Sequence, residues 1–171
     1  MQTREIVMAH GLYHQPAHFR SLAEVLRRSG FVVHIPTLYR GSLVGDTRAV
    51  QAIVNACEKP PIAVGHSYGG AVITGLTGVS ALVYVAAFVP DAAESCASLG
   101  GPDAPINRWV RPHAGGGTYI PAEDAAQLFY ADCSPETARW ATELLLPQEP
   151  GHGVVLGPSS WRRVTRPTCP G

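Results

Sequence analysis

The fold is decided by residues 62–70, which read IAVGHSYGG. The run Ile62–Val64 has the composition of a strand buried on both faces, and the residues that follow Gly69 suit a helix. Gly65, Ser67 and Gly69 match the pattern G-x-S-x-G, which is typical of a serine on a sharp strand-to-helix turn. We therefore predict that Ser67 is a nucleophile.

The chemistry of such a turn explains the residue types around the serine. Gly65 and Gly69 are small, so the flanking segments can approach one another closely and the Ser67 hydroxyl is exposed. The following helix points its N-terminus at the site, where free N–H groups favour developing negative charge. A chance pentapeptide in a loop is the alternative, but it does not explain the strand and helix signals on either side.

A second turn precedes the strand-to-helix turn of Ser67, which we call the elbow. His10-Gly11-Leu12 follows the apolar run 6–9, and a glycine there lets the backbone bend so that an N–H group faces the serine. An oxyanion needs two donors, and we assign them to the backbone N–H groups of Leu12 and Tyr68. We expect His10 to be a structural residue of this turn and not a base.

Strand and helix signals alternate through the first half of the chain. This alternation predicts right-handed βαβ units and a parallel sheet with the strand order second, first, third, fourth. The switch point then lies between the first and third strands, where both turns emerge. The expected helices begin at Pro16, at Asp46 as N-cap, and at Gly69, the last ending near residue 77; the expected strands cover residues 6–9, 31–35, 62–64 and 81–87.

The organisation changes after residue 90. We expect an α/β core at 1–90, a helical lid at 91–160, and the start of a C-terminal core at 161–171. Residues 100–102 and 115–117 read as loop, and we expect little regular structure between them. Two lid helices are expected within 121–147, the second capped by Ser134.

The sequence resembles the α/β-hydrolase superfamily, and most closely its small esterase and hydroxynitrile-lyase branch, which includes plant methylesterases of the salicylate-binding type. The matching stretches lie within residues 4–164, at 6–19, 61–75 and 81–95, with a similar cap at 119–147. This resemblance implies a parallel α/β sheet with a helical lid. It also implies a Ser–acid–His triad, with no metal and no organic cofactor.

The expected acid and histidine of that triad do not follow the lid. In the family each of them follows a further strand, whereas residues 165–171 read TRPTCPG, and Pro167 and Pro170 cannot donate to a central ladder. We therefore expect a truncated or frame-shifted chain whose hydrolysis is impaired. His113 and His152 are the remaining histidines after Ser67. Of these two, His152 is the candidate base, although a Gly/Pro loop orients an imidazole poorly.

Composition excludes several classes of protein. Thirteen basic and thirteen acidic residues cancel, which gives no footprint for nucleic acid or a membrane surface. The longest apolar run, 81–89, is far shorter than the roughly 20 residues of a membrane span. No secretory signal is present, and the four cysteines have no zinc spacing, so we expect a cytoplasmic protein. On a helix, the spacing of His10, His14 and His18 would place three possible metal ligands on one face. Gly11 and Pro16 interrupt such a helix, so we do not expect a metal site there.

These observations predict an esterase that acts on a small, mostly apolar ester. A carbon–carbon lyase of the hydroxynitrile type would use the same elbow, and a non-catalytic module that binds a small ligand is the other alternative. Without later strands, the run Ala81–Val89 would be an unpaired apolar edge, through which we expect self-association.

Overall fold

The computed structural model describes residues 4–38, 42–151, 157 and 160. Its centre is a sheet of four parallel strands in the order β2-β1-β3-β4, which is the order predicted from the sequence. The α/β fold class is therefore confirmed. The strands are β1 (Arg4–Ala9), β2 (Phe31–His34), β3 (Ile62–His66) and β4 (Ala81–Val85).

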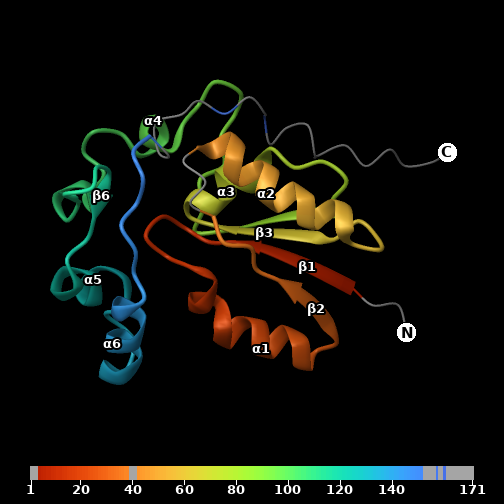
Figure 1. Ribbon diagram of the computed structural model, residues 1–171, viewed down its shortest axis with the longest axis horizontal. Coiled ribbons are helices and arrows are strands. Elements are labelled where there is room, and N and C mark those ends of the chain that lie inside the picture. Colours follow the sequence, from red (N-terminus) through yellow and green to blue (C-terminus); the bar gives the residue numbers. More distant parts are fainter. Residues whose placement is uncertain (1–3, 39–41, 152–156, 158–159, 161–171) are drawn as a thin grey trace.

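Helices cover both faces of this sheet. One face carries α1, and the opposite face carries α2 and α3 (Figure 1). A single 3-10 turn, η1, leads into α1 with a proline in its first turn, where the missing N–H costs little. The bounds are η1 (Pro16–Phe19), α1 (Arg20–Arg28), α2 (Leu43–Ala56) and α3 (Tyr68–Thr74).

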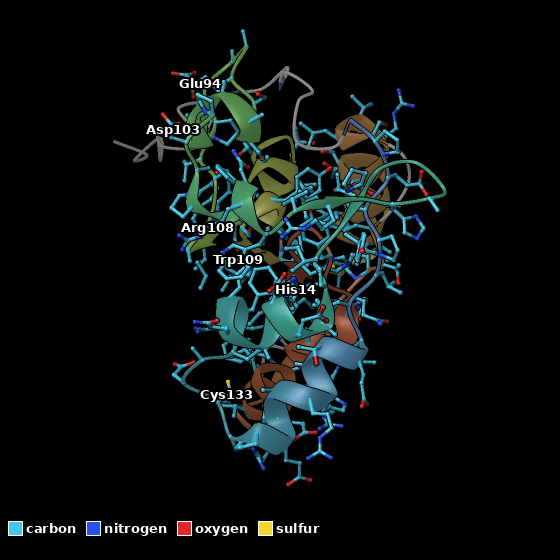
Figure 2. All side chains as sticks on the ribbon, turned by 90° about the vertical axis from the view of Figure 1, so that its left-hand side faces the viewer. His14, Glu94, Asp103, Arg108, Trp109 and Cys133 are labelled. Atoms are coloured by element: carbon cyan, nitrogen blue, oxygen red, sulfur yellow. The ribbon has the colours of Figure 1, made fainter. Side chains whose placement is uncertain are left out.

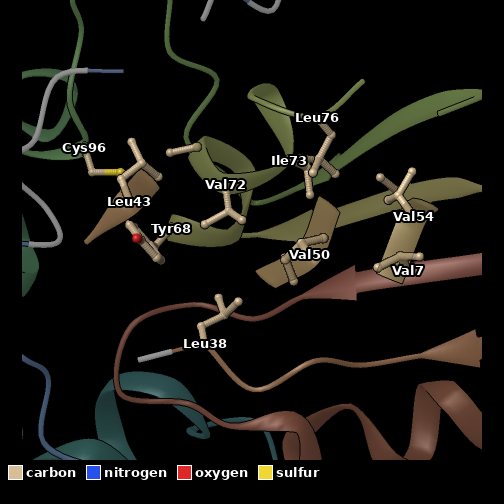
Figure 3. Close-up of a cluster of buried hydrophobic side chains, with 13 residues drawn as sticks. Val7, Leu38, Leu43, Val50, Val54, Tyr68, Val72, Ile73, Leu76 and Cys96 are labelled. Atoms are coloured by element: carbon tan, nitrogen blue, oxygen red, sulfur yellow. The ribbon is translucent and has the colours of Figure 1, made fainter. Parts of the chain in front are cut away.

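Alternation along β1 builds a core on each face of the sheet. Ile6 and Met8 point toward α1, whereas Val7 and Ala9 point toward α2 and α3, because successive side chains of a strand face opposite ways. Figure 3 shows the larger of the two clusters, between the sheet and α2–α3. Burial of this apolar surface fixes the strand register, since a slip of one residue would exchange the two faces.

The start of α2 differs from the prediction. We expected Asp46 as the N-cap, but the helix begins at Leu43 and the Ser42 hydroxyl accepts a hydrogen bond from the Gly45 N–H at 3.0 Å. Asp46 lies one turn further on, fully buried, and its carboxylate accepts a hydrogen bond from the Tyr68 hydroxyl at 2.9 Å. The prediction missed Ser42 because serine and aspartate are both common N-cap residues, and the sequence alone does not show which of the two begins the helix.

The lid contains more regular structure than the sequence suggested. The two expected helices are present, and Ser134 caps the second one through the Thr137 N–H. The expectation of little structure between residues 102 and 115 was wrong in part, because a 3-10 turn and one strand of a short hairpin lie there. These elements are α4 (Cys96–Gly100), η2 (Pro105–Arg108), β5 (Arg111–Pro112), β6 (Thr118–Tyr119), α5 (Ala122–Phe129) and α6 (Pro135–Glu143).

The hairpin strand β6 and the helices α5 and α6 stand together at one side of the sheet (Figure 1). The strands run toward them, so the lid lies at the carboxyl ends of the strands. Of the predicted segments, 161–171 lies outside the described residues, as does His152. Within the part that the structure describes, no helix combines the length and the apolar character that a membrane crossing requires.

Candidate active site

Ser67 occupies a strained position between β3 and α3. Its backbone angles are φ 53° and ψ −122°, a region that only glycine adopts readily. The strain persists because both neighbours are regular elements buried in the core. This geometry is that of a serine on a strand-to-helix elbow, as the sequence indicated.

The two glycines of the elbow allow a close approach of backbone segments. A Cβ atom at Gly65 would lie 2.5 Å from the carbonyl oxygen of Gly69, and one at Gly69 would lie 2.1 Å from the carbonyl oxygen of Ala9. Real Cβ contacts are never that short. No side chain fits at either position, so β1, β3 and α3 meet through backbone alone.

A segment after β4 also holds the elbow. The Ser67 carbonyl accepts hydrogen bonds from the N–H groups of Gly70 at 3.0 Å and Phe88 at 3.1 Å. Ala86, two residues earlier, has a positive φ of 42°. The predicted strand ran through Ala87, but β4 ends at Val85 because the chain turns here to reach the elbow. Nothing in the local sequence signals this turn.

The His10-Gly11-Leu12 turn lies directly against Ser67. A Cβ atom at Gly11 would be 3.0 Å from the Ser67 Cβ and 3.4 Å from its Oγ. Leu12 and Ser67 line the same cavity, and Tyr68 is the first residue of α3. The residues that we assigned to the oxyanion donors therefore flank the serine.

His10 is fully buried and bonded on both ring nitrogens. Nδ1 lies 2.9 Å from the Gly11 carbonyl, and Nε2 accepts from the Leu38 N–H at 3.3 Å. Since Nε2 accepts, the ring is neutral and Nδ1 is the donor. Burial lowers the pKa of His10 below its ordinary value. These contacts place His10 as a support of the turn.

Tyr13 joins this turn to the lid, a role that the sequence did not reveal. Its φ of 66° is strained, and three contacts hold it. Its N–H donates to Gln148 Oε1 at 3.3 Å, its carbonyl accepts from the Leu146 N–H at 2.8 Å, and its hydroxyl lies 3.0 Å from Thr118 Oγ1. The backbone next to Leu12 is thus fixed by residues more than 100 positions away.

The histidines that follow Tyr13 anchor the lid helices. His14 Nδ1 bonds the Leu12 carbonyl at 2.8 Å, and its Nε2 lies 2.9 Å from the Tyr130 hydroxyl. His18 Nε2 bonds the Ala141 carbonyl at 3.0 Å. Figure 2, which faces the lid side, labels His14 beside α5. Each ring is committed to the lid or the turn, so the spacing 10, 14, 18 does not make one ligand face.

No side chain within residues 4–38 and 42–151 makes a hydrogen bond to the Ser67 hydroxyl. His66 is half-buried beside Gly11, and burial lowers its pKa. His113 is exposed on the β5–β6 turn. The described histidines therefore supply no base bonded to Ser67, and His152 lies outside the described residues.

A cavity of about 540 Å³ opens in front of Ser67, between the sheet and the lid. Its walls are largely apolar, with a few polar groups among them. Gln148 is one of these, and its Nε2 is buried without a hydrogen-bond partner among the residues that the structure describes. A space of this size fits a small molecule. The lining includes Leu12, Tyr13, Ser67, Phe88, Ile106, Asn107, Val110, Thr118, Phe129 and Gln148.

A strained serine at the carboxyl end of a parallel sheet, beside a glycine turn and under a lid, defines the class of α/β proteins with a nucleophile elbow. The sequence matches the alpha/beta hydrolase family over residues 6–169. The chain therefore belongs to that family.

One curated protein is similar in sequence, the carbendazim hydrolyzing esterase of Nocardioides sp. (strain SG-4G). The two are 36% identical over an alignment of 110 residues that covers 54% of this chain and 46% of the relative. The match thus spans less than half of that relative's length.

Solved structures show the same fold. A pyrethroid hydrolase from Sphingobium faniae JZ-2 aligns with a TM-score of 0.78 at 20% identity, over 96% of this chain and 76% of that one. An extracellular α/β-hydrolase from a Paenibacillus species, described as similar to tobacco salicylic acid binding protein 2, gives 0.76 at 20%, over 94% and 72%. A methylesterase from Arabidopsis gives 0.69 at 18%, over 92% and 72%. The structural neighbours thus include esterases, in agreement with the resemblance read from the sequence.

Proposed function

We propose that this protein is a serine-dependent esterase for small, mostly apolar esters. The observation that carries the proposal is the strained Ser67, whose side chain lines the apolar cavity beside Leu12. The esterases among its relatives support the reaction class. The apolar lining supports the substrate class.

The proposed reaction follows from the arrangement of the site. Ser67 Oγ attacks the ester carbonyl, the carbonyl oxygen gains negative charge, and the N–H groups of Leu12 and Tyr68 stabilise it. Collapse of the tetrahedral intermediate releases the alcohol and leaves an acyl-serine, which water then hydrolyses. Strain at residue 67 keeps the hydroxyl directed into the cavity.

We propose that turnover by this chain is weak. A serine hydroxyl is a poor nucleophile without a base, and no described side chain bonds to Ser67 Oγ. The oxyanion donors and the cavity alone give a residual acceleration on the order of 10³–10⁴ over water. An acid and a histidine outside the described residues, His152 included, would raise it.

Hydrolysis of p-nitrophenyl butyrate tests this proposal. We expect slow release of p-nitrophenol by this chain and still slower release by Ser67→Ala, in which water must replace the serine hydroxyl as the attacking group. A kcat within the usual 1–10³ s⁻¹ that Ser67→Ala abolishes would contradict impaired turnover and direct attention to His152. Release that Ser67→Ala leaves unchanged would contradict serine dependence.

A non-catalytic role in binding a small ligand is the second candidate. It is favoured by the combination of a formed cavity with a serine to which no side chain in the described part of the chain is bonded as a base. Thermal stabilisation by a non-hydrolysable aryl ketone, without Ser67-dependent turnover of any ester, would support this candidate. Cleavage of an aromatic cyanohydrin in place of esters would instead support a hydroxynitrile-type lyase on the same elbow.

We also propose that the protein works in the reducing environment of the cytoplasm. Cys57, Cys96 and Cys133 are free thiols. Burial raises the pKa of the Cys96 thiol to about 12, so this side chain behaves as an inert core residue.

A further inference from the structure

A carboxylate, an imidazole and a thiol meet on the sheet away from Ser67. Glu5 lies near the start of β1, His34 is the last residue of β2, and Cys57 follows the end of α2. Their ligand atoms all lie within 4.8 Å of one another. Ala9, which pairs beside the elbow, lies four residue steps along β1 from Glu5, a distance of roughly 13 Å at strand spacing.

The three groups are held in place by regular elements. Glu5 Oε2 lies 2.8 Å from His34 Nε2, and Glu5 Oε1 accepts a hydrogen bond from the Glu58 N–H at 2.8 Å. The side chains of Glu5 and His34 are 12% and 34% exposed. The Cys57 thiol donates to the Ile53 carbonyl at 3.3 Å. Oε2 of Glu5, Nε2 of His34 and the thiol therefore face one another from three elements.

We propose that Glu5, His34 and Cys57 bind a divalent transition metal, and the donor set points to Zn²⁺. Zinc accepts sulfur, nitrogen and carboxylate oxygen together, whereas Mg²⁺ and Ca²⁺ take oxygen ligands. A tetrahedral zinc at about 2.0–2.3 Å from each donor separates the donors by roughly 3.5 Å. Glu5 and His34 need to open by less than 1 Å to reach that spacing. Solvent fills the fourth position.

Binding of the metal is balanced by proton release. The Cys57 thiol loses its proton to solvent and binds as thiolate, and His34 binds through its neutral Nε2. The Glu58 N–H stays on the second carboxylate oxygen and orients it, as outer partners do at metal sites.

A simple ion pair is the ordinary explanation of Glu5 and His34. It accounts for the 2.8 Å contact and leaves the thiol as a hydrogen-bond donor to the Ile53 carbonyl and to Glu5. A metal uses all three groups and links β1, β2 and the end of α2. It would therefore stabilise the core and leave Ser67 untouched.

Titration of the full chain with Co²⁺ tests the proposal. We expect a thiolate-to-cobalt charge-transfer band in the near ultraviolet with one equivalent of metal, and displacement of the band by Zn²⁺. Cys57→Ser should abolish the band, and His34→Gln should weaken binding at least tenfold. The matched control Cys133→Ser, which removes an exposed thiol on the lid, should leave the band intact.

A second readout guards against variants that fail to fold. Zn²⁺ should raise the Tm of the chain and of Cys133→Ser, but not that of Cys57→Ser, with far-ultraviolet circular dichroism confirming that each is folded. Absence of the band in the chain itself would overturn the proposal. So would a band, or a Tm shift, that Cys57→Ser leaves unchanged. None of these measurements depends on ester hydrolysis.

Discussion

At the scale of single residues, Ser67 has a strained backbone and a side chain that lines the cavity. Its φ of 53° is of the kind that costs about 1–3 kcal/mol in a residue with a side chain. A natural chain keeps such strain where the surrounding structure imposes it, here through β3, α3 and the Phe88 N–H. The strain and the placement of the hydroxyl are two consequences of one turn.

Glycine at position 67 should relieve this strain. We expect Ser67→Gly to exceed Ser67→Ala by about 1 kcal/mol in the free energy of unfolding, because glycine adopts φ > 0 without steric cost. Urea denaturation of the two variants measures the difference. Ser21, exposed in the ordinary helix α1, is the control, and there glycine should be less stable than alanine by about 1 kcal/mol. If the difference in unfolding free energy between glycine and alanine had the same sign at both sites, the strain at Ser67 would be contradicted.

At the scale of elements, the lid is attached to the turn that carries Leu12. Tyr13, His14 and His18 all bond to lid residues. Arg20 of α1 also stacks over Trp140 of α6, with 4.5 Å from its guanidinium carbon to the ring centroid. The position of α5 and α6 therefore sets the position of the proposed oxyanion donor.

This attachment should weaken in acid. Burial lowers the pKa of His14 to about 4, below the ordinary 6.5, so the unfolded chain binds more protons than the folded chain between these values. The stabilisation is complete above about pH 6.5 and is lost as the pH falls to about 4, a loss on the order of 3 kcal/mol. The free energy of unfolding as a function of pH measures it. His14→Gln should flatten the slope across this window, and an unchanged slope would contradict the account.

The sequence allowed prediction of the elements whose causes are local. The glycines around Ser67 and the apolar runs of the strands identified the sheet, its order and the elbow. Interactions between distant segments could not be predicted. The Tyr13 turn depends on Gln148 and Leu146, and the bend at Ala86 depends on the Ser67 carbonyl. Asp46 was misread for the same reason, since its partner Tyr68 lies two elements further along the chain.

At the scale of the whole molecule, β4 borders the described sheet on one side. Val83 and Val85 are 42% and 47% exposed on the face that α1 covers elsewhere. Leu82 and Tyr84, on the other face, pack on the core with α3. An edge strand with exposed apolar side chains is a template for association with other chains.

We expect this chain to self-associate through β4. Sedimentation velocity should show a weight-average mass that rises with concentration, and Val85→Lys should shift the distribution toward monomer. Val44→Lys, at an equally exposed position on α2, is the control and should have no effect. A monodisperse monomer that unfolds cooperatively at all concentrations would rule out this interface.

The most direct test of the elbow is prolonged reaction with a fluorophosphonate, followed by peptide mass spectrometry. The Ser67 oxygen displaces fluoride from phosphorus, and its proton passes to solvent. We expect slow modification of the unaltered chain at the single residue Ser67. In Ser67→Ala we expect no other residue to be modified to a comparable extent. An unmodified Ser67 in a folded chain, with label instead on exposed serines such as Ser21, would contradict it.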